Sequence, residues 1–257
     1  MIKSLKSKIN DKMKKLIPPC LKYPLKTILK EGIIKSIKIW RDEIDRKMIK
    51  YFSNLYTQTF HKLYYYSETK TWQNTYWLGI PVQKCPLDLW IYQEIIYETK
   101  PEIIIETGTA KGGSALFLAS LCELIKKGEI ITIDISDSFI SHPRIIKIIG
   151  DSTSEKVVQQ VKKIVKNKTA MVILDSDHSK IHVLKEMEIY SKFVSTGNYL
   201  IVEDTNINGH PVLSSLGEGP MEAVKEFLQK EKSFKIDGDK EKFFLTFSPK
   251  GFLKRQF

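Results

Sequence analysis

Several short, β-branched apolar runs in this sequence of 257 residues end in acidic side chains. Two of the runs end in Asp175-Ser-Asp177-His178 and in Glu203-Asp204. Carboxylates that meet at neighbouring strand ends repel one another unless a cation lies among them. Because all-oxygen ligand sets suit Mg²⁺, Mn²⁺ or Ca²⁺ better than zinc, these acids predict a divalent-cation site. The alternative is that the two aspartates cap the next helix and the later acidic pair lies in solvent.

A glycine-rich segment follows the first of these runs. It reads Glu106-Thr-Gly108-Thr109-Ala-Lys-Gly112-Gly113-Ser114. Glycine lets the backbone turn sharply and approach a ligand closely, and a helix that begins near Ser114 offers free N–H groups. The spacing is not the GxGxxG of dinucleotide enzymes, and the acid before Gly108 favours a ligand that carries an ammonium group. A plain strand-to-helix turn, the simpler alternative, needs only one of these glycines.

Two further acids continue the pattern along the chain. Asp134 ends the second run, 26 residues beyond Gly108, where a carboxylate can accept both hydroxyl groups of a ribose. Asp151 follows the third run, where an adenine amino group would find a partner. Each acid taken alone could simply cap the following helix. Their succession after consecutive strands predicts a cofactor that contains a nucleoside.

These residues need a scaffold that brings several strand ends together. Strand-like runs occupy residues 103–106, 129–134, 145–149, 170–175, 199–203 and 243–248. Helical patterns occupy residues 89–99, 114–127, 154–166, 180–194 and 220–232. The alternation predicts an α/β fold with a doubly wound, mostly parallel sheet that is covered on both faces and binds ligands beyond its carboxyl ends. The short tail after the last run allows that strand to insert antiparallel at an edge.

The formal net charge of +11 is concentrated at the start of the chain. Residues 1–50 hold 15 basic and 5 acidic residues, so the remainder is nearly neutral. A basic protein would ordinarily suggest nucleic acid or an anionic membrane as its partner, but this distribution excludes a broad nucleic-acid-binding face. We therefore predict a basic, amphipathic helical extension over residues 1–70 and one α/β domain over residues 71–257.

The extension contains three amphipathic stretches, at residues 2–16, 28–48 and 51–66. Either these helices pack on the main domain or on a second subunit, with their lysines in water, or they lie on an anionic membrane surface. In the second case each lysine near the lipid contributes about 1 kcal/mol. The following segment, residues 71–88, is dense in Trp and Pro and is either plain packing or a lid on a pocket.

Cysteine usage and hydropathy indicate where the protein is found. Cys20, Cys85 and Cys122 lie far apart, without the spacing of a disulfide framework or a metal site, which is typical of a reducing compartment. We find neither an apolar run of 18 residues nor a secretory signal. We expect a cytoplasmic protein, peripheral at the inner membrane face if residues 1–50 contact lipid.

Five motifs together resemble one protein family. They are Gly79–Asp88, Glu106–Ala115, Leu174–Ser179, Val202–Thr205 and Gly217–Ala223, within a segment from Trp77 to about Leu228. This segment resembles the cephalosporin-hydroxylase-type family, whose members look like S-adenosylmethionine-dependent O-methyltransferases. It is also similar to the catechol-type O-methyltransferases, in which a Mg²⁺ holds the acceptor oxygens. The resemblance implies a Rossmann-like class I methyltransferase fold, S-adenosylmethionine as cofactor, and Mg²⁺ or another divalent cation.

The resemblance also implies roles for individual residues. The methionine part of the cofactor falls to Glu106, Gly108, Gly112, Gly113 and Ser114, the ribose to Asp134 and the adenine side to Asp151, with Thr109 and Asp175 completing the cofactor-binding set. Glu203 and Asp204 are implied metal ligands. For the ligand on the fourth strand, catechol-type spacing indicates Asp175, whereas the closer family indicates Asp177. We favour Asp177 and keep Asp175 as an alternative ligand or a support.

His178 lies one residue beyond Asp177, close to where the catechol type places its basic residue. We predict that His178 is the general base that removes a proton from the acceptor hydroxyl. The alternative is a histidine that only supports a ligand or caps a helix. His182 and His210 are weaker candidates.

The predicted function is a Mg²⁺-dependent, S-adenosylmethionine-dependent O-methyltransferase. Its acceptor would be a hydroxyl of a sugar, a glycan or a glycosylated natural product, because vicinal oxygens suit chelation by a cation. The competing hypothesis is a hydroxylase or hydroxylase helper, but iron chemistry of that kind would require two histidines and one carboxylate. A non-catalytic binding module would not need the carboxylates. Apolar faces in residues 1–70 and the family resemblance favour a homo-oligomer.

Overall fold

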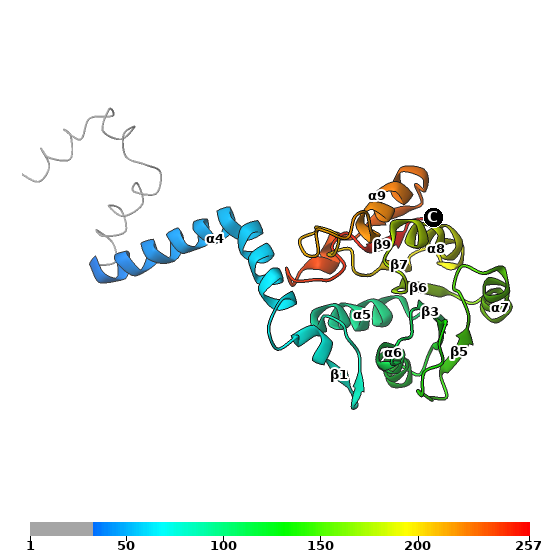
Figure 1. Cartoon of the computed structure of the whole chain (residues 1–257). Helices are drawn as coiled ribbons and strands as arrows, with labels where there is room; N and C mark the ends of the chain where they lie inside the picture. Colours follow the sequence, from blue (N-terminus) through cyan, green and yellow to red (C-terminus); the bar gives the residue numbers. More distant parts are fainter. Residues whose placement is uncertain (1–32) are drawn as a thin grey trace, which may run out of the picture. The chain divides into compact units, whose positions relative to one another are not determined.

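The computed structural model describes residues 33–257. The predicted helix at residues 2–16 and the first residues of the 28–48 stretch lie outside this part. The chain divides into two compact units between Thr59 and Phe60, and the boundary that we predict after residue 70 stays a prediction. Helix α4 (Ile33–Tyr65), blue to cyan in Figure 1, confirms the helical extension over the described residues. No helix within residues 33–257 is long and apolar enough to cross a membrane.

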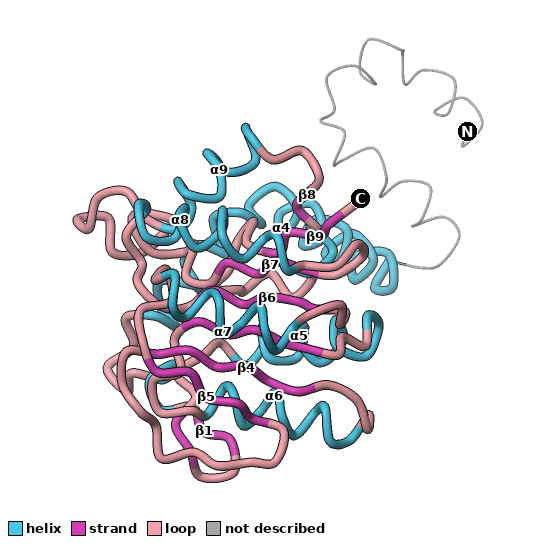
Figure 2. Tube along the Cα trace, turned by 90° about the vertical axis from the view of Figure 1, so that its right-hand side faces the viewer, coloured by secondary structure: helices cyan, strands magenta, loops and turns pink. Residues whose placement is uncertain are grey.

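A seven-stranded sheet forms the centre of the unit that begins at Phe60. Its strands in spatial order are β5 (Ile145–Ile149), β4 (Glu129–Asp134), β3 (Ile103–Thr107), β6 (Ala170–Leu174), β7 (Tyr199–Val202), β9 (Phe252–Arg255) and β8 (Phe234–Ile236). The first five are parallel, and β9 pairs antiparallel with both β7 and β8. Figure 2 shows this succession in magenta, from β5 upward to β9. The doubly wound, mostly parallel sheet is thereby confirmed.

Helices cover both faces of this sheet. They are α5 (Pro86–Thr99), α6 (Gly113–Leu124), α7 (Glu155–Val165), α8 (Lys180–Tyr190) and α9 (Pro220–Lys230). Smaller elements are the hairpin of β1 (Tyr76–Trp77) with β2 (Ile80–Pro81) and the short 3₁₀ helices Thr71–Asn74, Ser191–Phe193 and Gly238–Glu241. Ile103 and Ile105 pack against α7, α8 and α9, whereas Ile104 packs against α5 and α6. Neighbouring strand residues point to opposite faces, so burial of both faces requires uninterrupted apolar strands.

The two central strands, β3 and β6, determine where a ligand can bind. From β3 the chain enters α6 on one face, and from β6 it enters α8 on the other face. A crevice opens where successive connections leave a parallel sheet in opposite directions. The carboxyl ends of β3, β6 and β7 carry the glycine-rich segment and the acids discussed above.

The predicted strand at residues 243–248 is wrong. The strand that pairs antiparallel with β7 is β9, and β8 forms the sheet edge. The side chains of Leu245 and Phe247 are buried in a separate cluster with Cys85, Tyr64 and other residues, and the Phe247 N–H donates to the Asp88 carboxylate at 2.8 Å. The apolar run at residues 243–248 is therefore buried by side chains outside the sheet, and hydrophobic periodicity alone does not distinguish this from burial in a strand.

Candidate active site

The turn after β3 brings backbone unusually close to the end of β6. Gly108 has φ of +85°, and a Cβ atom there would lie 1.9 Å from the Asp175 carbonyl oxygen. A Cβ on Gly113, at the start of α6, would lie 2.2 Å from the Pro81 carbonyl oxygen. Gly112, the residue between the turn and the helix, also has positive φ. These three glycines are thus required by close approach or by left-handed backbone.

Asp134, at the end of β4, holds this turn in place. One carboxylate oxygen accepts the N–H groups of Thr109 and Ala110, both at 3.0 Å, and the other accepts the Ser136 N–H at 2.9 Å. Asp134 also lines a cavity of about 430 Å³ together with Gly108 and Asp151. The structure therefore brings together the residues predicted for the ribose and the adenine, and the role of Asp134 in orienting the turn is additional to the prediction.

Glu106 is the buried acid of the predicted methionine site. Its Oε2 accepts the hydroxyl of Thr132 at 2.7 Å, whereas its Oε1 is buried without a hydrogen-bond partner. Burial raises the pKa of Glu106 to about 7, against the opposing effects of the Lys84 ammonium and of the nearby Ser114 and Thr132 hydroxyls. A buried carboxylate oxygen without a partner is uncommon and indicates a missing donor. An ammonium group of a ligand would be such a donor.

The 430 Å³ cavity contains residues that sequence analysis missed. Ser152 and Ser176 line it, and their hydroxyls donate to the fully buried Glu186 at 2.5 and 2.8 Å. His182, a weaker candidate for the general base, also lines this cavity and lies 3.5 Å from Glu186. The i, i+4 spacing of His182 and Glu186 on one helix was the available signal. Asp151 uses one carboxylate oxygen to accept the N–H and hydroxyl of Thr153.

A second group of residues gathers at the ends of β6 and β7. The ligand atoms of Asp175, His178 and Asp204 all lie within 4.8 Å of one another. His178 Nε2 is 3.3 Å from Asp204 Oδ2. Asp204 has φ of +53°, so left-handed backbone directly after β7 turns its side chain into the group. Two carboxylates and an imidazole are suitable donors for a divalent cation.

Glu203 lies beside this group but already has partners for both oxygens. Lys84 Nζ is 2.7 Å from Glu203 Oε2 and 2.6 Å from Asp175 Oδ2, and the Tyr92 hydroxyl donates to Glu203 Oε1 at 2.7 Å. Burial alone would lower the pKa of Lys84, but the Asp175 and Glu203 carboxylates hold it above its ordinary value. No role was predicted for Lys84, although Lys84 is the one charged residue between Ile80 and Leu87.

Asp177 and His210 stand apart from this group. Asp177 is exposed, and its carboxylate accepts the Ser179 N–H at 2.7 Å at the start of α8. His210 Nε2 is 2.7 Å from Glu222 Oε1. The assignments of Asp177 as a catalytic group and metal ligand and of Glu203 as a metal ligand stay predictions.

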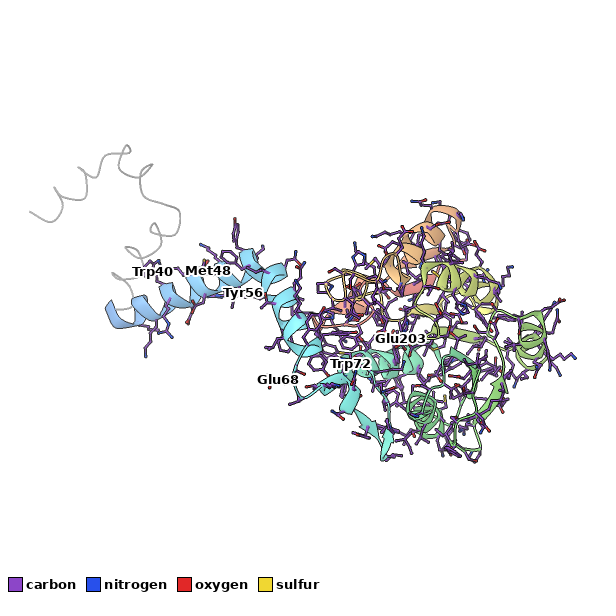
Figure 3. All side chains as sticks on the ribbon, viewed as in Figure 1. Trp40, Met48, Tyr56, Glu68, Trp72 and Glu203 are labelled. Atoms are coloured by element: carbon purple, nitrogen blue, oxygen red, sulfur yellow. The ribbon has the colours of Figure 1, made fainter. Side chains whose placement is uncertain are left out.

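The turn after β3 at residues 108–112, which we call the cofactor turn, shares one cavity of about 260 Å³ with the group of Asp175, His178 and Asp204. This cavity is lined by Gly108, Ser114, Lys84, Asp175, His178 and Asp204, among others. A neighbouring cavity of about 450 Å³ shares His178, Asp204 and Trp72 with it and adds apolar side chains such as Leu213. Figure 3 labels Trp72 and Glu203, which come from the segment before β1 and from the end of β7. His178 and Asp204 thus lie at the junction of two cavities.

Comparisons with known proteins agree with this geometry. The family model described as Rhamnosyl O-methyltransferase/CmcI matches residues 69–256. The rhamnosyl O-methyltransferase of Mycobacterium tuberculosis (strain ATCC 25618 / H37Rv) is 37% identical over 214 residues, which cover 79% of this chain and 86% of that protein. The rhamnosyl O-methyltransferase of Mycobacterium leprae (strain TN) is 38% identical over 212 residues, which cover 77% of this chain and 90% of that protein.

Solved structures share the fold. The apo structure of CmcI-N160 superposes with a TM-score of 0.56 at 19% identity and covers 72% of this chain and 77% of its own. The structure of cmcI-D160 with Mg and SAM gives a TM-score of 0.57 at 19% identity, with 72% and 78% covered. The match to the family model spans most of this chain and the mycobacterial relatives exceed 35% identity. The chain therefore belongs to the Rhamnosyl O-methyltransferase/CmcI family, and the O-methyltransferase class expected from its sequence is confirmed.

Proposed function

We propose that the protein transfers a methyl group from S-adenosylmethionine to a hydroxyl of a sugar or a glycosylated natural product, with Mg²⁺ or another divalent cation. One observation carries the proposal: the cofactor turn at Gly108 and the group of Asp175, His178 and Asp204 line the same 260 Å³ cavity. A methyl donor and a chelated acceptor must meet within bonding distance, and this cavity is where they would do so. The rhamnosyl O-methyltransferase relatives support the choice of a sugar acceptor.

The residues present fit both groups. The unpartnered Oε1 of Glu106 suits the ammonium of a methionine moiety, and Asp134 and Asp151 line the adjoining 430 Å³ cavity, where a nucleoside would lie. The carboxylates of Asp175 and Asp204 would hold the cation. When bound, the cofactor supplies an activated methyl group and the cation stabilises the deprotonated form of a hydroxyl.

The chain's own contribution to the reaction centres on His178. Its imidazole lines both the 260 Å³ cavity and the 450 Å³ cavity on the other side of Asp204. It can therefore reach an acceptor that enters through the larger cavity and accept the hydroxyl proton on a ring nitrogen. Asp204, 3.3 Å from Nε2, stabilises the imidazolium that results. Trp72 and Leu213 offer apolar wall on which a sugar ring can rest.

The proposal is tested by incubating the full chain with methyl-labelled S-adenosylmethionine, Mg²⁺ and a panel of sugar and phenol acceptors. We expect a mass gain of one methylene on a sugar acceptor, and loss of the product when a chelator removes the cation. Incorporation of oxygen instead of a methyl group would support the hydroxylase alternative. No observation favours that alternative, because the group in the described residues holds one histidine and two carboxylates rather than two histidines and one carboxylate.

His178→Gln is expected to lower kcat by about 10²-fold, the usual contribution of a positioned general base. Glutamine keeps a polar side chain of similar reach but accepts no proton at neutral pH. Cofactor affinity, measured by calorimetry with S-adenosylhomocysteine, should stay within about twofold of the wild type, or about 0.4 kcal/mol, since His178 does not line the 430 Å³ cavity of Asp134 and Asp151. His142→Gln is the control, because His142 lines none of the three cavities, and an equal loss of kcat in that variant would contradict the assignment.

The N-terminal segment, residues 1–50, bears on the assembly and the location of the protein. We place the protein in the cytoplasm as a homo-oligomer, with residues 1–50 as the segment that meets either a second copy or an anionic membrane surface. The exposed Ile39, Met48 and Ile49 on α4 support such a contact, since exposed apolar side chains favour burial. Removing residues 1–50 and comparing assembly size and liposome binding tests both partners. An unchanged assembly that binds no less lipid would contradict this role.

A further inference from the structure

A buried lysine lies among the strand-end carboxylates. The Lys84 side chain is 4% exposed and donates to Asp175 Oδ2 at 2.6 Å and to Glu203 Oε2 at 2.7 Å. A lysine is almost never fully buried unless it is paired, and here it has two carboxylate partners on two neighbouring strands. Lys84 also lines the 260 Å³ cavity, so this ion pair borders the site rather than lying in a remote part of the core.

The backbone that carries Lys84 is fixed independently of the ion pairs. The Lys84 N–H donates to the Thr75 hydroxyl oxygen, and that hydroxyl donates to the Lys84 carbonyl, both at 3.3 Å. Cys85, the next residue, is buried and begins the cap of α5. The backbone that carries the ammonium group is therefore anchored by contacts that do not involve the carboxylates.

The charges at the strand ends require such a cation. Asp175, Glu203 and Asp204 bring three negative charges together, and Lys84 supplies one positive charge. Lys84 also takes a single oxygen of Asp175, which leaves the second oxygen for a ligand.

We propose that Lys84 is a positioning residue that holds Asp175 and Glu203 together when no metal is bound, supplying the positive charge that a divalent cation supplies when it binds. The inference rests on the proposed function for the presence of the metal. This role of Lys84 differs in one respect from that of an ion pair that only stabilises the fold. A metal ion should replace the stabilising charge of Lys84, because the carboxylates beside Lys84 bind cations of both kinds.

Lys84→Met keeps the length and apolar stem of the side chain and removes the charge. Without metal, this variant should melt about 10 °C below the wild type, because it leaves buried carboxylates unpaired. Mn²⁺ alone, added at saturation, should recover most of that loss and should raise the melting temperature of the variant more than that of the wild type. Its affinity for Mn²⁺, followed by electron paramagnetic resonance, should be about tenfold tighter, since a repelling positive charge is gone.

Lys240→Met is the matched control. Lys240 is also buried, at 8% exposure, and pairs with Glu98 at 2.8 Å, outside the cavity that Lys84 lines. Its variant should lose stability without any added rescue by Mn²⁺. Equal rescue of the two variants, or a Lys84→Met protein that is not rescued while the wild type binds Mn²⁺, would overturn the inference.

A second variant keeps the test decisive if Lys84→Met does not fold. Lys84→Met/Glu203→Gln removes both members of one ion pair, and the Gln carbonyl can still accept the Tyr92 hydroxyl. This double variant should fold and melt above the single variant without metal. A double variant that is no more soluble or stable than the single one would overturn the inference. If the wild type itself binds no Mn²⁺, the metal in the proposed function is wrong, and that outcome is distinct from failure of rescue.

Discussion

Asp204→Asn is expected to lower metal-dependent methyl transfer by about 10³-fold, equal to about 4 kcal/mol of transition-state stabilisation. The carboxylate of Asp204 is one of the two that we assign to the cation, and it also faces His178 at 3.3 Å. Asparagine is the right replacement because residue 204 has φ of +53°, a left-handed conformation that Asn tolerates better than Ala. The turn should therefore persist while one negative charge is lost. Initial rates with and without added Mg²⁺ give the measurement.

Cofactor binding separates this result from misfolding. S-adenosylhomocysteine affinity should fall much less than turnover, since Asp204 borders the turn at Gly108 but does not line the 430 Å³ cavity that holds the predicted ribose and adenine residues. Asp177→Asn is the matched control, because Asp177 is exposed and binds the start of α8. A severe loss in Asp177→Asn would favour the ligand set predicted from the sequence, in which Asp177 joins Glu203 and Asp204, and would contradict the choice of Asp175. Turnover of Asp204→Asn within about tenfold of the wild type would exclude a direct role in metal binding.

The limits of sequence-based prediction differ between the sheet and its last segment. Strands β4 and β5 agree with prediction to the residue, although β4 is largely buried and β5, at the sheet edge, is partly exposed. The run at residues 243–248 is also apolar, but its Leu245 and Phe247 are buried by Tyr64, Cys85 and neighbouring side chains. Composition predicts burial, whereas the partner that provides it depends on tertiary structure.

In the candidate active site too, some features could be predicted from the sequence and others could not. Acids at the ends of β6 and β7 could be predicted to meet, because parallel strands end at one edge of the sheet. Which carboxylate oxygens remain available could not, since that depends on Lys84 and Tyr92, which are 119 and 111 residues away from Glu203 in sequence. Spacing alone left Asp175 and Asp177 as competing ligands. The structure groups Asp175 with His178 and Asp204, whereas Asp177 accepts the Ser179 N–H before α8 and lines the 430 and 450 Å³ cavities.

Gly108→Ala is expected to show the second large effect, of about 4 kcal/mol in total. The added Cβ would lie 1.9 Å from the Asp175 carbonyl oxygen, and overpacking against backbone costs about 1–3 kcal/mol. The φ of +85° adds about 1–2 kcal/mol for a residue with a side chain. If the turn stays in place, this energy is lost from the free energy of unfolding. If the turn moves away from β6, the stability is spared and S-adenosylhomocysteine should bind about 10³-fold more weakly.

The strain must lower either the free energy of unfolding or the affinity for S-adenosylhomocysteine. Both are therefore measured on the same protein, the first by urea unfolding and the second by calorimetry. Gly197→Ala is the control: Gly197 has φ of +81°, but a Cβ there meets nothing within 4 Å. It should therefore lose only the backbone contribution of about 1–2 kcal/mol in stability and none in affinity. If Gly108→Ala behaves like Gly197→Ala, the contact between the turn and Asp175 does not shape the cofactor site. A larger loss in Gly108→Ala, summed over stability and S-adenosylhomocysteine affinity, would instead show that cofactor binding depends on the close approach of β3 and β6. These two strands end at the cofactor turn and at Asp175, which we assign to the metal site.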